Sequence, residues 1–148
     1  MNHEHFMREA IKEAEKGRAS GNWPIGSVIT IDDKIVARDY SRIYSSNNRL
    51  AHAEKNVLEQ AQRFLFDKKA DATLYTTYSP CVMCFGAIIM SRINTLVYGT
   101  DIDNTGFAPH RDSLPSGYDR DDFDLEVIGG VLEKECREIF IKNRFGVK

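Results

Sequence analysis

Hydrophobic and polar positions along the chain follow two different periods, which predict a mixture of helices and strands. Apolar residues recur at helical spacing in three segments, over about residues 5–17, 51–66 and 131–144. Runs rich in β-branched and aromatic residues occupy 24–31, 35–40, 72–78 and 96–99, with a last short run at 125–128. The first two runs flank a polar turn at residues 32–34 and predict an antiparallel hairpin. Strands that alternate with helices indicate an α/β protein.

The segments between these elements differ in character. Residues 41–50 are polar and rich in turn formers, so we expect a loop. Ser79 can cap a helix and Pro80 suits a first turn, which predicts a helix over about 81–92. Residues 101–124 have no clean periodicity, and they are too many for a simple connection. We expect an ordered functional loop there, or one that carries a short helix.

Length and composition point to one globular domain spanning residues 1–148, with 42% hydrophobic and 28% charged residues. No apolar run approaches the ~18 residues of a membrane span, and residues 1–16 are too polar for a signal peptide. We therefore expect a cytoplasmic protein without a membrane partner.

Charge gives no general attraction to nucleic acid, because the formal net charge is -2. Residues 101–126 hold eight acidic side chains against two arginines. Such a segment is usually a solvated loop. It would repel a phosphate backbone if it lay beside the functional site.

Two short motifs carry the chemistry: His52-Ala53-Glu54 and a C-x-x-C pair, Cys81 and Cys84. One His and two Cys are three zinc ligands of a catalytic kind, which leave a fourth position for water. The two cysteines share a helix face at this spacing, and a helix N-terminus favours thiolate over thiol. Glu54 is then the natural group to move the protons of the water. We expect two helix N-termini to converge on one Zn²⁺.

Other interpretations of the cysteines are weaker. A thioredoxin-like redox pair would not need the His-x-Glu motif. A structural zinc site usually has four protein ligands, and His110 is the one further candidate outside the N-terminal segment. Cys136 lies in the middle of the last predicted helix and is most simply a small buried hydrophobe.

Four stretches resemble the cytidine deaminase-like superfamily: HAE (52–54), TLYTTYSPCVMCFGAIIMSRI (73–93), VYG (97–99) and PIGSVI (24–29). The H-x-E…P-C-x-x-C pattern is the signature of zinc nucleobase deaminases. The resemblance implies a three-layer α/β/α sandwich with a five-stranded mixed sheet, and a homodimer or larger oligomer. It also implies that His52, Cys81 and Cys84 hold the zinc ion and that Glu54 is catalytic.

The expected substrate pocket combines this resemblance with the sequence. Its candidate residues are Trp23, Ile25, Gly26, Ser41, Ala53, Ser79 and Cys81. Gly26 inside a strand also indicates that a ligand or another backbone approaches closely there. Related deaminases commonly carry an Asn eleven residues before the His, where this chain has Ser41. Asn47 or Asn48 substitutes for that Asn, or the substrate differs. Backbone contacts from the Ser79 carbonyl and the Cys81 N–H would still suit an amino-substituted ring.

Three functions remain open. We favour hydrolytic deamination of a small amino-substituted nucleobase, nucleoside or related heterocycle, because of the acidic segment and Ser41. The alternative is adenosine-to-inosine deamination in tRNA. Residues 91–93, 101–106 and 129–136 resemble bacterial tRNA adenosine deaminases, and five basic residues lie near the C-terminus. The third is a non-catalytic zinc protein of the same fold. Other stretches resemble cytosine and guanine deaminases, so the sequence does not choose the ring.

Overall fold

A computed structural model describes residues 2–67, 71–118 and 124–144. Its centre is one sheet with the strand order β2-β1-β3-β4-β5. The strands are β1 (Gly26–Ile31), β2 (Lys34–Tyr40), β3 (Ala72–Tyr78), β4 (Thr95–Thr100) and β5 (Glu126–Ile128). β1 pairs antiparallel with β2 and β3, whereas β3, β4 and β5 run parallel. The predicted five-stranded mixed sheet is confirmed.

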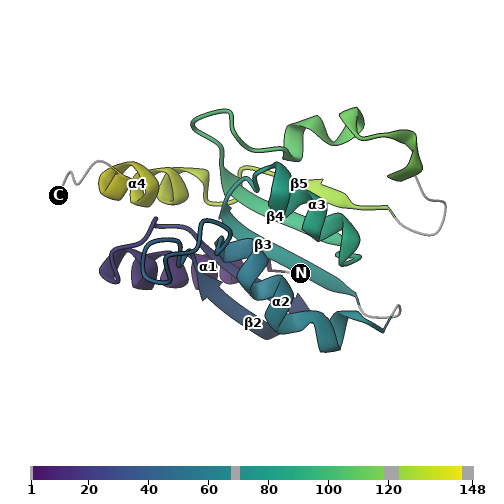
Figure 1. Ribbon diagram of the computed structural model, residues 1–148, viewed down its shortest axis with the longest axis horizontal. Coiled ribbons are helices and arrows are strands. Elements are labelled where there is room, and N and C mark those ends of the chain that lie inside the picture. The colour runs from purple at the N-terminus through teal and green to yellow at the C-terminus, as the bar shows by residue number, and fades with distance from the viewer. Residues whose placement is uncertain (1, 68–70, 119–123, 145–148) are drawn as a thin grey trace.

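Helices cover both faces of this sheet (Figure 1). They are α1 (His3–Ala19), α2 (Ala53–Leu65), α3 (Val82–Met90) and α4 (Glu133–Arg144). One hydrophobic cluster joins α2 and α3 to the sheet through residues such as Val57, Phe85 and Leu96. A second cluster joins α1 and α4 to the other face, where Met7, Tyr75 and Cys136 are fully buried. The protein therefore has the predicted α/β/α layers.

The apolar stripe predicted for α2 is confirmed. Its five residues, Ala53, Val57, Leu58, Ala61 and Leu65, are all buried. A narrow apolar stripe on a helix is stable only against another apolar surface, here the sheet. This packing fixes the start of α2, and thereby the direction in which His52 and Glu54 point.

The topology brings one end of each of four strands, β1, β2, β3 and β4, to the same edge of the sheet. β1 begins at this edge, where the Gly26 N–H donates to Thr77 Oγ1 over 3.2 Å. β2 is antiparallel to β1, so its end at Tyr40 lies at the same edge, and the parallel strands β3 and β4 also end there. The residues that follow β2, β3 and β4 meet there, although they are far apart in the sequence.

The start of α3 differs from the prediction. Ser79 does not cap this helix, because Cys81 is its N-cap and the helix begins at Val82. The Ser79 N–H instead donates to the Thr100 carbonyl over 2.8 Å and continues the pairing of β3 with β4. The prediction of a Ser79 cap is therefore wrong.

The long segment after β4 carries two short 3-10 helices, Ala108–Ser113 and Ser116–Tyr118, which confirms that it contains helix. Residues 119–123, predicted to belong to this loop, lie outside the described residues. In the described part of the chain, no helix is long and apolar enough to cross a membrane.

Candidate active site

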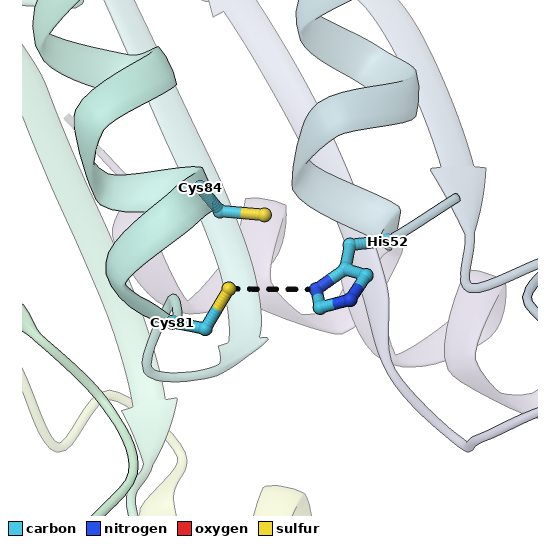
Figure 2. Close-up of side chains that lie close together, drawn as sticks. All are labelled: His52, Cys81 and Cys84. Carbon is cyan, nitrogen blue, oxygen red and sulfur yellow. Dashed lines mark hydrogen bonds between the residues drawn. The ribbon is translucent and has the colours of Figure 1, made fainter. Parts of the chain in front are cut away.

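His52, Cys81 and Cys84 come together at the N-termini of α2 and α3 (Figure 2). Their ligand atoms all lie within 4.8 Å of one another, and His52 Nδ1 is 3.5 Å from Cys81 Sγ. No other group of three such side chains occurs among the described residues. His110 is exposed, packs its ring edge-on to Phe107, and is not part of the group.

Backbone geometry explains how the two helix starts present these side chains. His52 and Cys81 are the N-cap residues of α2 and α3, with extended backbones at ψ 151° and 174°. Neither side chain caps its own helix. An N-cap residue without that task can direct its side chain away from the helix, so both point to the space between α2 and α3.

Electrostatics make Cys81 the thiolate of the three groups. A hydrogen bond from the Cys84 thiol and a second one from His52 lower the pKa of Cys81 to about 4. The same contact raises the pKa of Cys84, because a second thiolate beside the first is unfavourable. The contact with Cys81 also raises the pKa of His52. One nitrogen and two sulfur ligands at this spacing fit Zn²⁺ in a three-ligand site of the catalytic kind.

Glu54 lies in the first turn of α2, beside this cluster. Its side chain is buried and lines the same pocket. Burial raises the pKa of Glu54 to about 7. A carboxyl group with such a pKa can both accept and return a proton near neutral pH.

These residues border a cavity of about 270 Å³. The structure brings six of the seven expected pocket residues to it: Trp23, Ile25, Ser41, Ala53, Ser79 and Cys81. Gly26 is not among its lining residues. A Cβ atom on Gly26 would lie 2.1 Å from the Ala10 carbonyl oxygen of α1, so close approach of a helix backbone accounts for this glycine.

Five further residues line the cavity that sequence reasoning did not select: Ile43, Tyr78, Asp103, Thr105 and Phe140. Tyr78 ends β3, and its hydroxyl accepts hydrogen bonds from the N–H groups of Ile102 and Asp103 over 2.9 and 2.7 Å. Its position directly before Ser79, close to the predicted start of a helix, is the one feature of the sequence that could have indicated a place in the pocket. Phe140 comes from α4, far along the chain, and only the fold reveals it.

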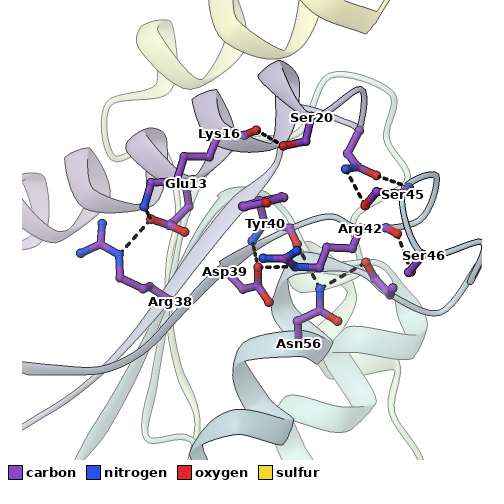
Figure 3. Close-up of polar contacts among 12 residues, drawn as sticks. Glu13, Lys16, Ser20, Arg38, Asp39, Tyr40, Arg42, Ser45, Ser46 and Asn56 are labelled. Carbon is purple, nitrogen blue, oxygen red and sulfur yellow. Dashed lines mark hydrogen bonds and ion pairs between the residues drawn. The ribbon is translucent and has the colours of Figure 1, made fainter.

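A polar network holds the segment that carries Ser41 (Figure 3). Asp39 is buried, accepts hydrogen bonds from Arg42 and Gln60, and raises the pKa of Arg42. Asn56 on α2 donates to the Tyr40 carbonyl over 3.0 Å and, more weakly, to the Ala51 carbonyl over 3.4 Å. Because Tyr40 precedes Ser41 and Ala51 precedes His52, Asn56 joins the substrate side of the pocket to the metal side.

Part of the acidic segment lies at the pocket. Asp103 is exposed and lines the cavity, whereas Asp124 is paired with Arg111. Asp119, Asp121 and Asp122 lie outside the described residues. The segment therefore contributes an acidic residue to the lining of the pocket.

Comparison with known proteins agrees with this geometry. The model of the cytidine and deoxycytidylate deaminase zinc-binding region matches residues 1–100. The tRNA-specific adenosine deaminase of Bacillus subtilis is 38% identical over 134 residues, which cover 90% of this chain and 83% of that protein.

Solved structures support the same relationship. A chain from a study of A-to-I editing by tRNA:A34 deaminases matches with a TM-score of 0.80 and 33% identity, over 91% of this chain and 98% of that one. Guanine deaminase from Bacillus subtilis matches with a TM-score of 0.63 and 31% identity, over 78% of this chain and 79% of that one. The chain therefore belongs to the zinc-dependent cytidine and deoxycytidylate deaminase family, and it is a hydrolase with the cytidine deaminase-like fold.

Proposed function

We propose that this deaminase converts adenosine to inosine in tRNA and releases ammonia. The observation that supports it most is the likeness to tRNA-specific adenosine deaminase, which extends over 90% of this chain at 38% identity. The sequence alone favours a small free heterocycle and keeps tRNA as the alternative. The comparisons support that alternative better.

The proposed roles follow from the geometry of the site. His52, Cys81 and Cys84 hold Zn²⁺, which supplies Lewis-acid activation of water at neutral pH. Glu54 accepts one proton from the attacking water and delivers it to the ring nitrogen, then accepts the remaining proton of the new hydroxyl group and delivers it to the departing amine. A bond forms between the water oxygen and the amino-bearing ring carbon, the C–N bond breaks, and ammonia leaves. Glu54 ends the cycle in its starting protonation state.

The pocket residues position the ring. We propose that Trp23, Ile25 and Ala53 contact its apolar faces, while Ser41, the Ser79 carbonyl and the Cys81 N–H contact its polar edge. Residues 1–148 form the single deaminase domain of this proposal. The cytoplasmic location expected from the sequence stays a prediction.

A small free substrate is the second candidate, and two observations favour it. Asp103, an acidic residue, lines the pocket, and negative charge there does not favour a phosphate backbone. Bacillus subtilis guanine deaminase also resembles this chain, at 31% identity against 33% for the tRNA:A34 deaminase structure, although its TM-score is 0.63 against 0.80. A non-catalytic zinc protein is disfavoured, because a purely structural zinc site would not need the buried carboxyl group of Glu54.

Ammonia release by the zinc-loaded protein tests these functions. The panel holds a tRNA anticodon stem-loop with adenosine at the wobble position, the same stem-loop with guanosine there, free adenine, guanine and cytosine, and their nucleosides. We expect ammonia and inosine from the adenosine stem-loop alone. Glu54→Ala should keep its zinc and lose about 10²- to 10⁴-fold in kcat, as is typical when a general acid–base group is removed.

The other outcomes separate the candidates. Turnover of a free base or nucleoside without turnover of the stem-loop would establish the second candidate. Loss of zinc from Glu54→Ala, with no turnover by the parent protein, would indicate the non-catalytic zinc protein.

We also propose a homodimer, in which α3 contributes to the interface. α3 contains no charged residue, and its Val82 and Met90 side chains are 66% and 70% exposed. Exposed apolar surface of this kind marks interaction sites.

A further inference from the structure

The C-terminal helix contributes one residue, Phe140, to the wall of the deaminase pocket. Phe140 is only 6% exposed. Its ring stacks on Trp23 with the planes 13° apart and the centroids 5.9 Å apart, and it lies 4.6 Å from the Tyr78 ring centroid. The three rings come from the segment before β1, from the end of β3 and from α4. Together they form a continuous aromatic wall.

Two buried serines also belong to the wall of this pocket. Ser41 and Ser79 line the cavity and are only 2% and 3% exposed. Neither hydroxyl oxygen has a hydrogen-bond partner among the described residues. Both oxygens are enclosed by the surrounding protein, so the surface that faces the cavity here is mainly that of the rings. The pocket therefore offers an aromatic surface for the face of a ring.

We infer that Phe140 is a substrate-binding residue, which together with Trp23 forms the apolar wall that contacts the base or the ribose of the substrate. This inference rests on the proposed deaminase function and adds a size limit to it. A free nucleoside and a nucleotide of tRNA must both fit a cavity of about 270 Å³ that α4 helps to close. That volume lies just below the ~300–1,000 Å³ usual for drug-sized ligands, which suits one nucleoside unit.

The effect of Phe140 should appear in KM. Phe140 has no titratable group and cannot move a proton, so its contact stabilises the bound substrate and the transition state alike. Removal of such uniform binding raises KM and leaves kcat nearly unchanged. Stacking of a base on an aromatic side chain changes binding by about 5- to 150-fold.

Kinetics of Phe140 variants test the inference. Phe140→Leu keeps an apolar side chain on α4 but removes the aromatic face. We expect it to raise KM at least about 5-fold with kcat within about 3-fold of the parent, and Phe140→Tyr to restore KM. Ile141→Ala, a change at a 38% exposed neighbour on the same helix, is the control and should leave both constants unchanged. A fall in kcat at constant KM in Phe140→Leu, or constants equal to those of the parent, would overturn the inference.

A binding measurement separates this inference from the proposed function. Trp23 is the only tryptophan of the chain, so intrinsic fluorescence reports on the wall itself. In a Glu54→Ala background, titration with adenosine, guanine and the stem-loop should quench Trp23 emission, and Phe140→Leu should weaken the Kd of the bound compound at least about 5-fold.

The outcomes of the two experiments can be told apart. Binding that depends on Phe140 without any turnover would contradict the proposed function and support the contact of Phe140 with the ligand. Turnover with a KM that does not depend on Phe140 would support the proposed function and contradict that contact. Neither binding nor turnover would overturn both.

Discussion

At the scale of single residues, Gly26 shows how a strand position is fixed by a neighbouring helix. A Cβ atom there would lie 2.1 Å from the Ala10 carbonyl oxygen and 2.4 Å from the Ala14 nitrogen. Both atoms belong to the backbone of α1, which cannot move away as a side chain can. The sequence predicted a close approach by a ligand or a backbone, and only the fold shows that it is a backbone.

Substitution of Gly26 should therefore be severe. We expect Gly26→Ala to lower the free energy of unfolding by about 3 kcal/mol or more, at the upper end for an overpacked site. Gly117→Ala is the control, because a Cβ there meets nothing within 4 Å and the position lies outside α3. It should change the free energy of unfolding by no more than about 0.5 kcal/mol. Urea denaturation of both variants measures the difference, and equal stabilities would contradict the proposed packing of α1 on β1.

The metal cluster and Glu54 could be predicted from the sequence, whereas much of the pocket could not. His52, Cys81 and Cys84 have spacings that only a shared ion explains well. Tyr78, Asp103 and Phe140 have no such spacing, because they meet through the order of strands in the sheet. Patterns along the sequence reveal residues whose spacing reflects a shared function, but they do not show which distant segments lie next to each other in the fold.

At the scale of elements, Asn56 connects α2 to the end of β2. Its amide donates to the carbonyls of Tyr40 and Ala51, next to Ser41 and His52. Asn56→Asp keeps the shape but places carboxylate oxygens against carbonyl oxygens. We expect the free energy of unfolding to fall by about 1–3 kcal/mol and KM to rise, with the zinc content unchanged.

The control for Asn56 lies one turn away on the same helix. Glu59 is exposed, and its carboxylate forms an ion pair with Lys55. Glu59→Ala should therefore leave KM unchanged and should change the free energy of unfolding by no more than about 0.5 kcal/mol. Zinc analysis, urea denaturation and kinetics of both variants check this. If the Asn56→Asp protein has the KM of the parent, the position of Ser41 does not depend on the hydrogen bonds that Asn56 donates from α2.

Two titratable groups, Cys136 and Tyr75, are buried between the sheet and the helices α1 and α4. We expect their burial to lower the free energy of unfolding at alkaline pH. Burial raises the pKa of Cys136 from 9.0 to about 12, and that of Tyr75 from 10.0 to about 12. Above about pH 9 the unfolded chain loses these protons while the folded protein keeps them. The contribution of these two groups to stability is thus constant below that pH and falls as the pH rises toward 12.

Cys136→Ala isolates one of these two groups. Each proton contributes a slope of about 1.4 kcal/mol per pH unit, so between pH 9 and 10.5 the stability of this variant should fall less steeply than that of the parent by about that amount. Urea denaturation at several pH values measures the slopes. Parallel slopes would show that the Cys136 thiol is not shielded from water in the folded protein.

At the scale of the whole molecule, the order of strands explains why the site is where it is. β1 starts, and β2, β3 and β4 end, at one edge, so Ile25, Ser41, Ser79 and Asp103 meet there. The layers were predictable because each element has an apolar face that must be covered. The course of residues 101–118 was not, because the 3-10 helices there have no apolar period that a sequence pattern could reveal.

The assembly of two chains is the remaining feature at this scale. The α3 surface with Val82 and Met90 is apolar and exposed in one chain. Burial of apolar surface contributes about 25 cal/mol per Å², so a second copy of this chain would gain from covering it. A charge in its centre would have to be desolvated in the dimer, but it stays in water in the monomer.

Val82→Glu should therefore favour the monomer without unfolding the chain, because the side chain is exposed before association. We expect the parent to sediment as a dimer and Val82→Glu to dissociate at least about 10-fold more readily, which corresponds to about 1.4 kcal/mol. Tyr118→Glu, a change at an exposed aromatic residue on another segment, is the control and should leave the dimer intact. Sedimentation velocity over a range of concentrations measures all three. A parent that stays monomeric, or a Val82→Glu protein that dimerises like the parent, would remove α3 from the interface.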